Sequence, residues 1–489
     1  MPLKRFVLPI RNSIICYKWH LLFITVLYVL AYLAYPATPG NTPHAHPLGW
    51  WGWFDQGKYL LSANAFAQLD LTPEKHFYPP LYTIIGAAFI KLSSGHPFFL
   101  INLFCLLWFS FVFIRVSERY ISRWSSIVLL FATTVLDQRI LINYVIPWTT
   151  TLSVALLSTG FIGLLWLIEL KEKEDARVNG WQIFTVALSL GLLVPTRPVD
   201  AIVGCVLGIV VFFVYWAIRR SAVDRLPRPH IFILLTFAGA AIGPAIFIGF
   251  NYASYGTFFG SYAKVASSNG FFIYDIPEKL LSLWLDGATL YAEPNAAISS
   301  KFPWIYVALA GLIWVLVKKD ILLRTIAITI CLLFALYMPY GDLLPNGLWR
   351  YLNIHYFKWT FPFLALFAWL LIKDILSLRR SGYSWGLPLA VLVVISSVLM
   401  CLSFSVQYAP LQVKSSPGNP IRFELPQGEI DFIDIKGLNS GFNEVYFGNH
   451  RLFVDGQELQ RVRNYRLLPK GSDVRLLFIR RSEERRVGK

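Results

Sequence analysis

The side chains best suited to acid–base chemistry lie close together between Gly49 and Tyr82. This stretch reads GWWGWFDQGKYLLSANAFAQLDLTPEKHFYPPLY. It places Asp55 among tryptophans, and Lys75 and His76 shortly before a Pro-Pro step. A carboxylate can take a proton from an attacking group, and basic side chains can hold an anion. Because most of the remaining sequence is apolar, we expect chemistry in water to take place at this loop.

The elements around this loop are predicted to be membrane helices. Of 489 residues, 56% are hydrophobic and 15% are charged, and apolar runs near the length of a bilayer span recur between Tyr17 and Val406. Helices of about 20 apolar residues cross a bilayer core, and unbroken apolar runs exclude the alternating pattern of a transmembrane barrel. We therefore expect an all-α polytopic membrane protein with 11 or 13 spans.

The expected spans are separated by short polar segments. The spans are 17–35, 79–92, 97–116, 124–136, 147–170, 181–194, 199–218, 231–250, 303–317, 321–338, 357–372 and 385–406. The first is an uncleaved anchor. Residues 55–71 have apolar residues at near-helical spacing and are predicted to form a helix at the membrane interface. The five cysteines show no metal or disulfide spacing.

The net charge of +16 is explained by basic residues in the loops between the expected spans and does not indicate a nucleic-acid partner. Basic residues stand between apolar runs, and the positive-inside rule then puts the N-terminus and loops 219–230, 318–324 and 373–380 in the cytoplasm. Loops 36–78, 251–302 and 339–356 fall outside. Membrane crossings counted forward from a cytoplasmic N-terminus and backward from the later loops disagree by one between residues 97 and 147. One apolar run there is therefore re-entrant, interfacial or split.

The amino-acid composition changes after residue 406. Residues 1–406 form the expected membrane module. Residues 407–480 alternate apolar and polar side chains between Asn, Gly and Asp-Gly turns, which predicts a small extracytoplasmic β-rich domain. The last nine residues, 481–489 (RSEERRVGK), resemble the translation of a sequencing adapter, and we set them aside as a non-native tail.

Five short motifs occur in order along the membrane module. They are Asp55 and Tyr59 in FDQGKYL, the Pro79-Pro80-Leu81 step, Arg197-Pro198 in VPTRPVDAI, NYASYGTFFGSY from Asn251 to Tyr262, and Arg350-Tyr351 followed by Pro362. Over residues 51–371 this order resembles the GT-C glycosyltransferases. The branch it resembles contains the protein O-mannosyltransferases and the lipid A aminoarabinose transferases.

That resemblance implies a fold, a donor and a mechanism. It implies a polyprenyl-phosphate sugar as donor, and a protein, lipid or glycan as the extracytoplasmic acceptor. The sugar would be transferred with inversion, with Asp55 as general base. A bacterial inner membrane is the expected setting, with the active site on the extracytoplasmic side. Judged from its position alone, Asp55 could instead cap the helix that follows it.

Transfer also needs cations to stabilise the departing phosphate. Arg350 is the strongest candidate because an arginine can hold two phosphate oxygens. The other candidates are Arg197, His76, Lys58, His355 and Lys358, although Lys58 and Lys358 also fit an anchoring role at the membrane interface. The substrate-binding candidates are Tyr59, Tyr78, Asn251, Tyr262 and Tyr351.

The sequence departs from the GT-C pattern at two acidic positions. Gln56 follows Asp55 where the mannosyltransferases have a second acid, and Trp148 follows Pro147 where members of the superfamily often have an aspartate. We therefore expect no divalent metal and no other cofactor. Asp200 lies three residues after Arg197 and is expected to pair with it.

Two choices stay open at this point. Trp50, Trp51 and Trp53 could stack on a sugar ring, but an aromatic belt at the membrane surface is the preferred interpretation. The chain as a whole could also be a transporter or flippase for lipid-linked sugars, or a non-catalytic scaffold of the cell envelope. A transporter predicts charges along a path through several spans and internal repeats, and we find no repeat.

Overall fold

The structure is a computed structural model of the whole chain. It describes residues 10–36, 38–39, 48–93, 95–172, 177–219, 225–260, 276–287, 297–339, 343 and 350–380, and the strands 432–435, 453–454, 457–458, 462–466 and 474–478. The chain divides into two compact units. Unit 1 holds residues 1–268, 308–336 and 354–382, and unit 2 holds residues 269–307, 337–353 and 383–489.

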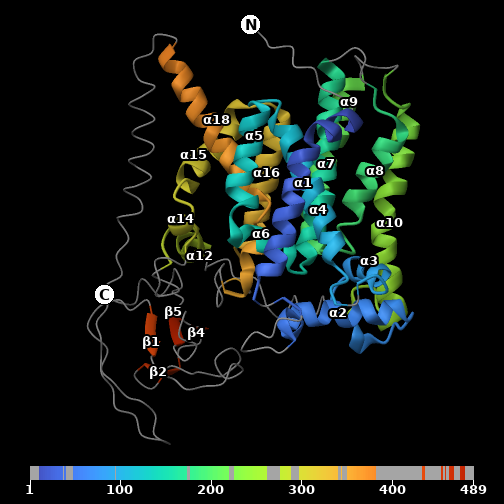
Figure 1. The fold of residues 1–489 in the computed structure, drawn as a ribbon, viewed down its shortest axis with the longest axis vertical. Helices are drawn as coiled ribbons and strands as arrows, with labels where there is room; N and C mark the ends of the chain where they lie inside the picture. Colours follow the sequence, from blue (N-terminus) through green and yellow to red (C-terminus); the bar gives the residue numbers. More distant parts are fainter. Residues whose placement is uncertain are drawn as a thin grey trace, which may run out of the picture. The chain divides into compact units, whose positions relative to one another are not determined.

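Among the residues that the structure describes, six helices are long and apolar enough to cross a membrane. They are α1 (Ile10–Ala34), α4 (Phe99–Ser117), α7 (Thr149–Glu172), α9 (Pro198–Arg219), α10 (Pro229–Tyr255) and α18 (Thr360–Arg380). A further candidate is a broken helix that bends by 75° and consists of α5 (Arg123–Leu130), the π-helix η3 (Phe131–Val135) and α6 (Gln138–Val145). Within unit 1 these helices run side by side (Figure 1). The chain is therefore an integral membrane protein.

Three shorter apolar helices accompany them. These are α8 (Gly180–Gly191), α15 (Ile305–Lys318) and α16 (Ile321–Tyr337). The backbones of α8 and α10 are so close that a Cβ at Gly191, Gly239 or Gly243 would overlap backbone atoms of the opposite helix. The expected run 385–406 lies outside the described residues, so the count of 11 or 13 spans stays a prediction.

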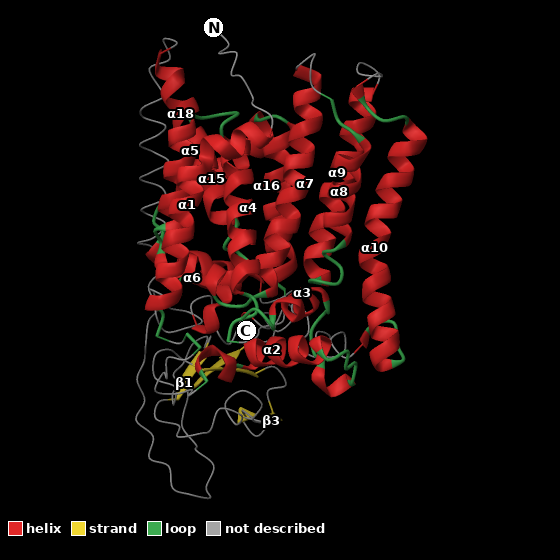
Figure 2. Ribbon diagram, turned by 45° about the vertical axis from the view of Figure 1, so that its right-hand side comes forward, coloured by secondary structure: helices red, strands yellow, loops and turns green. Residues whose placement is uncertain are grey.

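The expected span 79–92 is wrong. That segment contains α3 (Leu81–Phe89), whose nine residues rise about 14 Å, less than half the thickness of a bilayer core. Both α3 and α2 (Phe54–Ala67) lie at one end of the helices of unit 1, and α2 runs across that end (Figure 2). A helix is thus confirmed in the segment 55–71, and its place at a membrane interface stays a prediction. Between residues 97 and 147, where the two counts differ, the structure has the broken helix of α5, η3 and α6.

Of the three tryptophans before α2, Trp50 lies in the interior, while Trp51 and Trp53 are partly exposed. Trp50, in the 3-10 helix η1 (Gly49–Gly52), is 0% exposed and packs on Tyr35 and His96, with ring centroids 6.1 and 5.3 Å away. Trp51 donates its indole N–H to the Gly95 carbonyl at 3.0 Å. An aromatic belt is therefore wrong for Trp50, because its ring is covered by other aromatic side chains instead of facing lipid headgroups.

The end of unit 1 opposite α2 carries a network of charges that we call the Glu118 network. Arg115 lies 3.4 Å from Glu169 and 3.9 Å from Glu118, and Arg119 contacts both Glu172 and Asp320. The network contains five basic side chains, Arg115, Arg119, Arg123, Lys319 and Lys373, and five acidic ones, Glu118, Glu169, Glu172, Asp320 and Asp374. The described parts of the three basic loops lie at this end (Figure 1).

Unit 2 contains short elements. Its helices are α12 (Ile276–Leu280), the π-helix η6 (Leu281–Leu285) and α14 (Ile298–Lys301). Strands β1 (Phe432–Ile435), β5 (Val474–Phe478) and β4 (Val462–Arg466) form an antiparallel sheet in that order, and β2 (Phe453–Val454) pairs with β3 (Gln457–Glu458). Most of 407–480 and the whole of 481–489 lie outside the described residues, so the β-rich domain and the non-native tail stay predictions.

Candidate active site at the Asp55 end

The first site residue, Asp55, lies in the first turn of α2. The N-cap of this helix is Trp53, which makes no capping bond through its side chain. Asp55 is therefore not the cap, although a negative charge in this turn is favoured by the helix dipole. The hydroxyl of Tyr78 donates a hydrogen bond to Asp55 Oδ1. The residue before the Pro-Pro step thus contacts the candidate base directly.

Two more tyrosines hold this pair in place. The Tyr59 ring lies 4.8 Å from that of Tyr78 and 5.6 Å from that of Tyr82, between centroids. Tyr82 donates to Asn102 Oδ1 at 2.9 Å, which joins α3 to α4. Because Tyr59 and Tyr82 are both buried, their positions are fixed by packing and the half-buried Tyr78 is presented to Asp55.

The residue after Asp55 makes a buried contact with the segment before α7. Gln56 is 1% exposed and donates from Nε2 to the Pro147 carbonyl oxygen at 3.0 Å. A carboxylate could not donate this bond, so an acid at position 56 would face an acceptor. The contact also ties the beginning of α2 to the segment that leads into α7. Leu81 N–H similarly donates to the Pro195 carbonyl at 2.9 Å, next to Arg197.

Three successive threonines at the start of α7 each meet a different basic side chain. Arg197 Nη1 lies 3.5 Å from Thr149 Oγ1, His355 Nδ1 lies 3.0 Å from Thr150 Oγ1, and Lys358 Nζ lies 2.6 Å from Thr151 Oγ1. We call these six residues the threonine cluster. The positive end of the α7 dipole adds to the positive charge here.

Arg197 is the member of the threonine cluster with an acidic partner. Its Nε lies 3.1 Å from Asp200 Oδ2, and the two side chains are 14% and 7% exposed. The predicted pair is confirmed. The guanidinium also lies over the ring of Tyr356, 4.9 Å from its centroid. Thr149 of α7, Asp200 of α9 and Tyr356 of the segment before α18 together orient the guanidinium.

Lys358 and His355 come from the segment that leads into α18. Lys358 is 0% exposed, donates to the Asn143 carbonyl at 2.7 Å and lies over the Tyr144 ring at 4.4 Å. An anchoring role at the membrane surface is therefore wrong for Lys358, because its ammonium is enclosed by protein. Burial lowers the pKa of Lys358 well below its usual range, and the charge on Arg197 lowers it further.

His355 is buried beside Trp148. Its ring stacks on Trp148, with centroids 3.9 Å apart and planes 9° from parallel. Burial lowers the pKa of His355 well below its usual range, and the charges on Arg197 and Lys358 act in the same direction. The imidazole is therefore neutral. Among the described residues, no three His, Cys, Asp or Glu side chains come together, and the expected absence of a metal stays a prediction.

Two predicted site residues, His76 and Lys58, make their contacts outside the threonine cluster. His76 bonds Ser62 Oγ through Nδ1 and the Asp70 carbonyl through Nε2, both at 2.8 Å. A carbonyl only accepts, so Nε2 carries the proton. Burial lowers the pKa of His76. Lys58 lies 5.7 Å from the Phe54 ring centroid.

Four further candidates belong to later parts of the chain. Asn251 donates to the Phe258 carbonyl at 3.1 Å and closes the turn after α10. Arg350 and Tyr351 begin the 3-10 helix η8 (Arg350–Tyr356), and their side chains lie outside the described part, as does Tyr262. The structure thus brings Arg197, His355 and Lys358 together and leaves the predicted role of Arg350 untested.

Sequence reasoning missed the three threonines. A run of three hydroxyl side chains directly after Pro147-Trp148, at the start of an apolar span, was the available signal. Comparisons of the chain with protein-family models, with curated proteins and with solved structures give no match. The functional argument therefore depends on the geometry of Asp55 and the threonine cluster.

Proposed function

We propose that the chain is an integral membrane glycosyltransferase that moves a sugar from a polyprenyl-phosphate donor to an acceptor. The observation that carries the proposal is the pairing of a carboxylate, Asp55, with the guanidinium of Arg197 and the other nitrogen side chains at the start of α7, joined by the bond from Gln56 to Pro147. A base and an anion site at the same end of a membrane bundle are what transfer from a lipid phosphate needs.

The threonine cluster supports binding of the donor phosphate. Arg197 and Lys358 donate to neutral acceptors, the hydroxyls of Thr149 and Thr151 and the Asn143 carbonyl, and Arg197 also pairs with Asp200. A phosphate beside Arg197 would gain charge-assisted bonds from the guanidinium, and hydroxyl groups of the threonines can supply further donors. The helix N-terminus adds a favourable dipole for an anion. These groups would stabilise the phosphate as the bond to the sugar breaks.

Asp55 would act on the acceptor. A carboxylate that accepts one hydrogen bond from Tyr78 keeps lone pairs for a hydroxyl or amine proton. Removal of that proton as the acceptor attacks the anomeric carbon gives a single displacement with inversion. Tyr78 would orient the carboxylate. No metal or other cofactor takes part in this proposal.

The arrangement of α2 suits a substrate that is partly dissolved in the membrane. This helix runs across the end of the spans (Figure 2), where a lipid-linked sugar would carry its phosphate. The basic loops lie at the opposite end, so the positive-inside rule assigns the Asp55 end to the extracytoplasmic side. A bacterial inner membrane and an extracytoplasmic protein, lipid or glycan acceptor complete the proposal.

The test measures release of polyprenyl phosphate by the purified full chain. Polyprenyl-phosphate sugars labelled in the sugar are supplied together with an envelope extract as acceptor. We expect Asp55→Asn to lower turnover by about 10²- to 10⁴-fold, the usual contribution of a general base. Asp70→Asn is the matched control, because Asp70 lies in the same loop and bonds Thr72 and Lys75 instead of Tyr78.

Each outcome is decisive. Release that requires the acceptor and is lost only in Asp55→Asn supports the enzyme. Equal release by both variants removes Asp55 from the mechanism. If the folded wild-type protein releases nothing from any donor but moves labelled lipid between the leaflets of a vesicle, the protein is a transporter. If neither activity is present, the scaffold alternative holds.

A further inference from the structure

The turn after α10 presents aromatic side chains at the surface of unit 1. It belongs to the string that begins at Asn251, which the proposed function does not use. Tyr252, Phe258 and Phe259 are 63%, 60% and 71% exposed. The rings of Tyr252 and Phe258 stack, with centroids 6.2 Å apart. Large apolar side chains that are exposed next to one another commonly mark a surface that contacts another molecule.

The backbone of this turn is held by specific contacts. Gly256 ends α10 in the left-handed region, with a φ of 64°, and Asn251 donates to the Phe258 carbonyl at 3.1 Å. Gly260 also has a positive φ, and a Cβ there would come within 2.4 Å of Asn251 Oδ1. Glycine adopts such a backbone without steric cost. The exposure of Phe258 and Phe259 is therefore a property of the folded turn.

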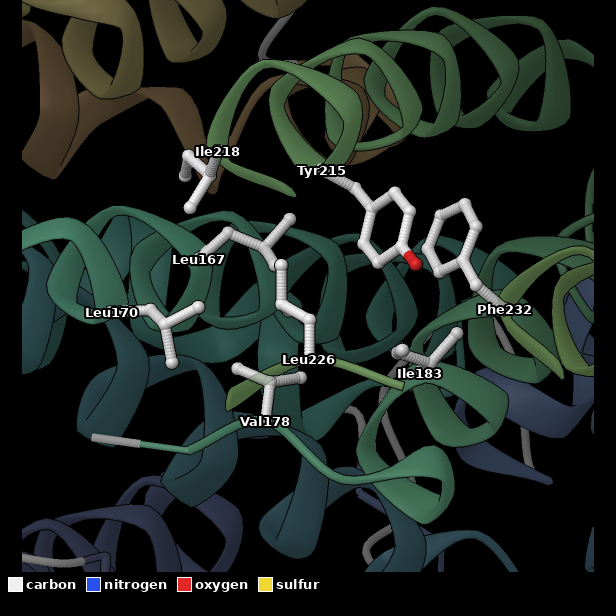
Figure 3. Close-up of a cluster of buried hydrophobic side chains, with 8 residues drawn as sticks. All are labelled: Leu167, Leu170, Val178, Ile183, Tyr215, Ile218, Leu226 and Phe232. Atoms are coloured by element: carbon white, nitrogen blue, oxygen red, sulfur yellow. The ribbon is translucent and has the colours of Figure 1, made fainter. Parts of the chain in front are cut away.

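The opposite end of α10 is fixed inside unit 1. Figure 3 shows the ring of Phe232 stacked on Tyr215 of α9, with centroids 3.5 Å apart. Tyr215 also donates to the Pro227 carbonyl at 2.7 Å, just before α10 begins. From Phe232 to Tyr252 an α-helix rises about 30 Å, the thickness of a bilayer core. Because Phe232 follows the basic loop 219–230, it lies near one membrane surface, and Tyr252 and the turn then lie near the other.

Two observations make lipid the neighbour of this turn. Leu234, Ile248 and Tyr252 are exposed and recur on one face of α10, and only 17% of the apolar stretch of this helix is buried. That face contacts acyl chains and continues directly into the turn. In addition, residues 229–263 contain no Asp, Glu, Lys or Arg. A surface without charge that extends a lipid-facing helix fits a membrane better than a soluble partner.

We propose that Tyr252, Phe258 and Phe259 anchor unit 1 in the headgroup layer of a phospholipid bilayer. Tyrosine rings are enriched at this level because they are apolar with one polar end, and phenylalanine enters the boundary between headgroups and acyl chains from interfacial segments. The anchor is an aromatic contact with the membrane surface at a different place from the one expected at Trp50. It is independent of the proposed function, because it requires no chemistry at Asp55.

The anchor lies at the Asp55 end of unit 1. The hydroxyl of Tyr255, in the last turn of α10, donates to the His76 carbonyl. The ring of Phe250 lies 5.5 Å from that of Phe66 in α2, between centroids. The end of α10 is therefore joined both to α2 and to the loop before α3. A lipid contact at the turn would place this corner of the protein at the membrane surface.

The first test maps lipid contacts of the full wild-type chain in nanodiscs. The nanodiscs contain a phosphatidylcholine that carries a photoactivated diazirine close to its glycerol, and mass spectrometry locates the cross-links. We expect cross-links at Phe258 or Phe259 and their loss at residues 72–74, which are exposed in the loop after α2. Equal labelling of the two segments, or no label at Phe258 and Phe259, overturns the proposal and leaves a soluble protein as the partner of the turn.

The second test measures depth with a spin label on single cysteines. Phe259→Cys, Ile248→Cys and Glu74→Cys are made in a chain without its native cysteines that melts at the wild-type temperature. Collisions with oxygen and with a water-soluble nickel chelate report the depth of each label in the bilayer. We expect the label at position 259 about 5–10 Å inside the headgroup boundary, the label at 248 deeper, and the label at 74 in water. If the nickel chelate reaches positions 259 and 74 equally, the proposal is wrong.

Discussion

Both ends of the unit 1 bundle bury basic side chains, but the groups that surround these side chains differ between the two ends. In the Glu118 network, five basic side chains share the space with five acidic ones, and Arg115, whose side chain is 7% exposed, lies near both Glu118 and Glu169. At the Asp55 end, Arg197 pairs with one acid, Asp200, and the cluster also contacts threonine hydroxyls, a carbonyl and the rings of Tyr144, Trp148 and Tyr356.

The difference indicates two roles for buried charge. Where acids and bases balance, the charges hold helix ends together and offer nothing to a further ion. Where bases exceed acids beside a helix N-terminus, an anion can complete the site. Four substitutions, ordered by expected effect, test whether the contrast is real.

The largest effect is expected at Arg197. Arg197→Met removes the guanidinium and leaves Asp200 buried, which costs about 3–5 kcal/mol of stability, and it should lower turnover of the donor by about 100-fold or more. Thermal unfolding and donor turnover per folded molecule measure the two effects. The double variant Arg197→Met/Asp200→Leu should recover stability without recovering turnover. A fully active double variant would remove Arg197 from the donor site.

Arg115→Met should destabilise the Glu118 network without affecting chemistry. The change leaves Glu169 and Glu118 without the buried guanidinium that lies near both, at a cost of about 3–5 kcal/mol in unfolding free energy. Turnover per folded molecule should equal that of the wild type. If turnover fell as far as in Arg197→Met, the two ends would not differ in role and the comparison would fail.

A buried histidine at the Asp55 end should make the stability of the protein depend on pH. Burial lowers the pKa of His96 to about 3, so the folded protein keeps this imidazole neutral while the unfolded chain binds a proton below about pH 6.5. Stability should therefore fall as pH drops from 6.5 towards 3, by up to about 1.4 kcal/mol per pH unit. His96→Phe retains aromatic contacts with Trp50 and Tyr32 and should flatten this slope in unfolding experiments. An unchanged slope would show that His96 is not its source.

The smallest effect is expected at the edge of the Glu118 network. Arg123 is 42% exposed and lies 2.6 Å from Glu118. Exposed ion pairs contribute about 0–1 kcal/mol, so Arg123→Gln should change the unfolding free energy by less than 1 kcal/mol. A loss comparable to that in Arg115→Met would mean that the network acts as one unit, and the contrast between buried and exposed members would need revision.

The sequence predicted the long elements well, because apolar runs of 18 or more residues have one stable form in a bilayer. Helices α4, α7, α9 and α10 lie where those runs were placed. The apolar run at 79–92 failed, because Pro79 and Pro80 delay the start of α3 and nine helical residues cannot span. The burial of Trp50 could not be predicted either, since only the folded loop brings Tyr35 and His96 into contact with its ring.

The site was predictable only in part. The pairing of Arg197 with Asp200 follows from helical spacing, and Asp55 was identified from its position in a polar loop. The threonine cluster required the tertiary fold, because Lys358 and Thr151 are 207 residues apart in sequence. A lysine beside an apolar run is most often an anchor at the membrane surface, and only the packing of Asn143 and Tyr144 around Lys358 reverses that expectation.

The glycine contact between α8 and α10 has a consequence for how the protein is made. The 12 residues of α8 rise about 18 Å, too little to cross a bilayer core. Its place in the membrane therefore depends on the backbone of α10, which packs against Gly191. Because α10 follows α8 in the chain, we expect α8 to reach its final position in the membrane only after α10 has been synthesised. Insertion of this region is thus a joint event of the two helices.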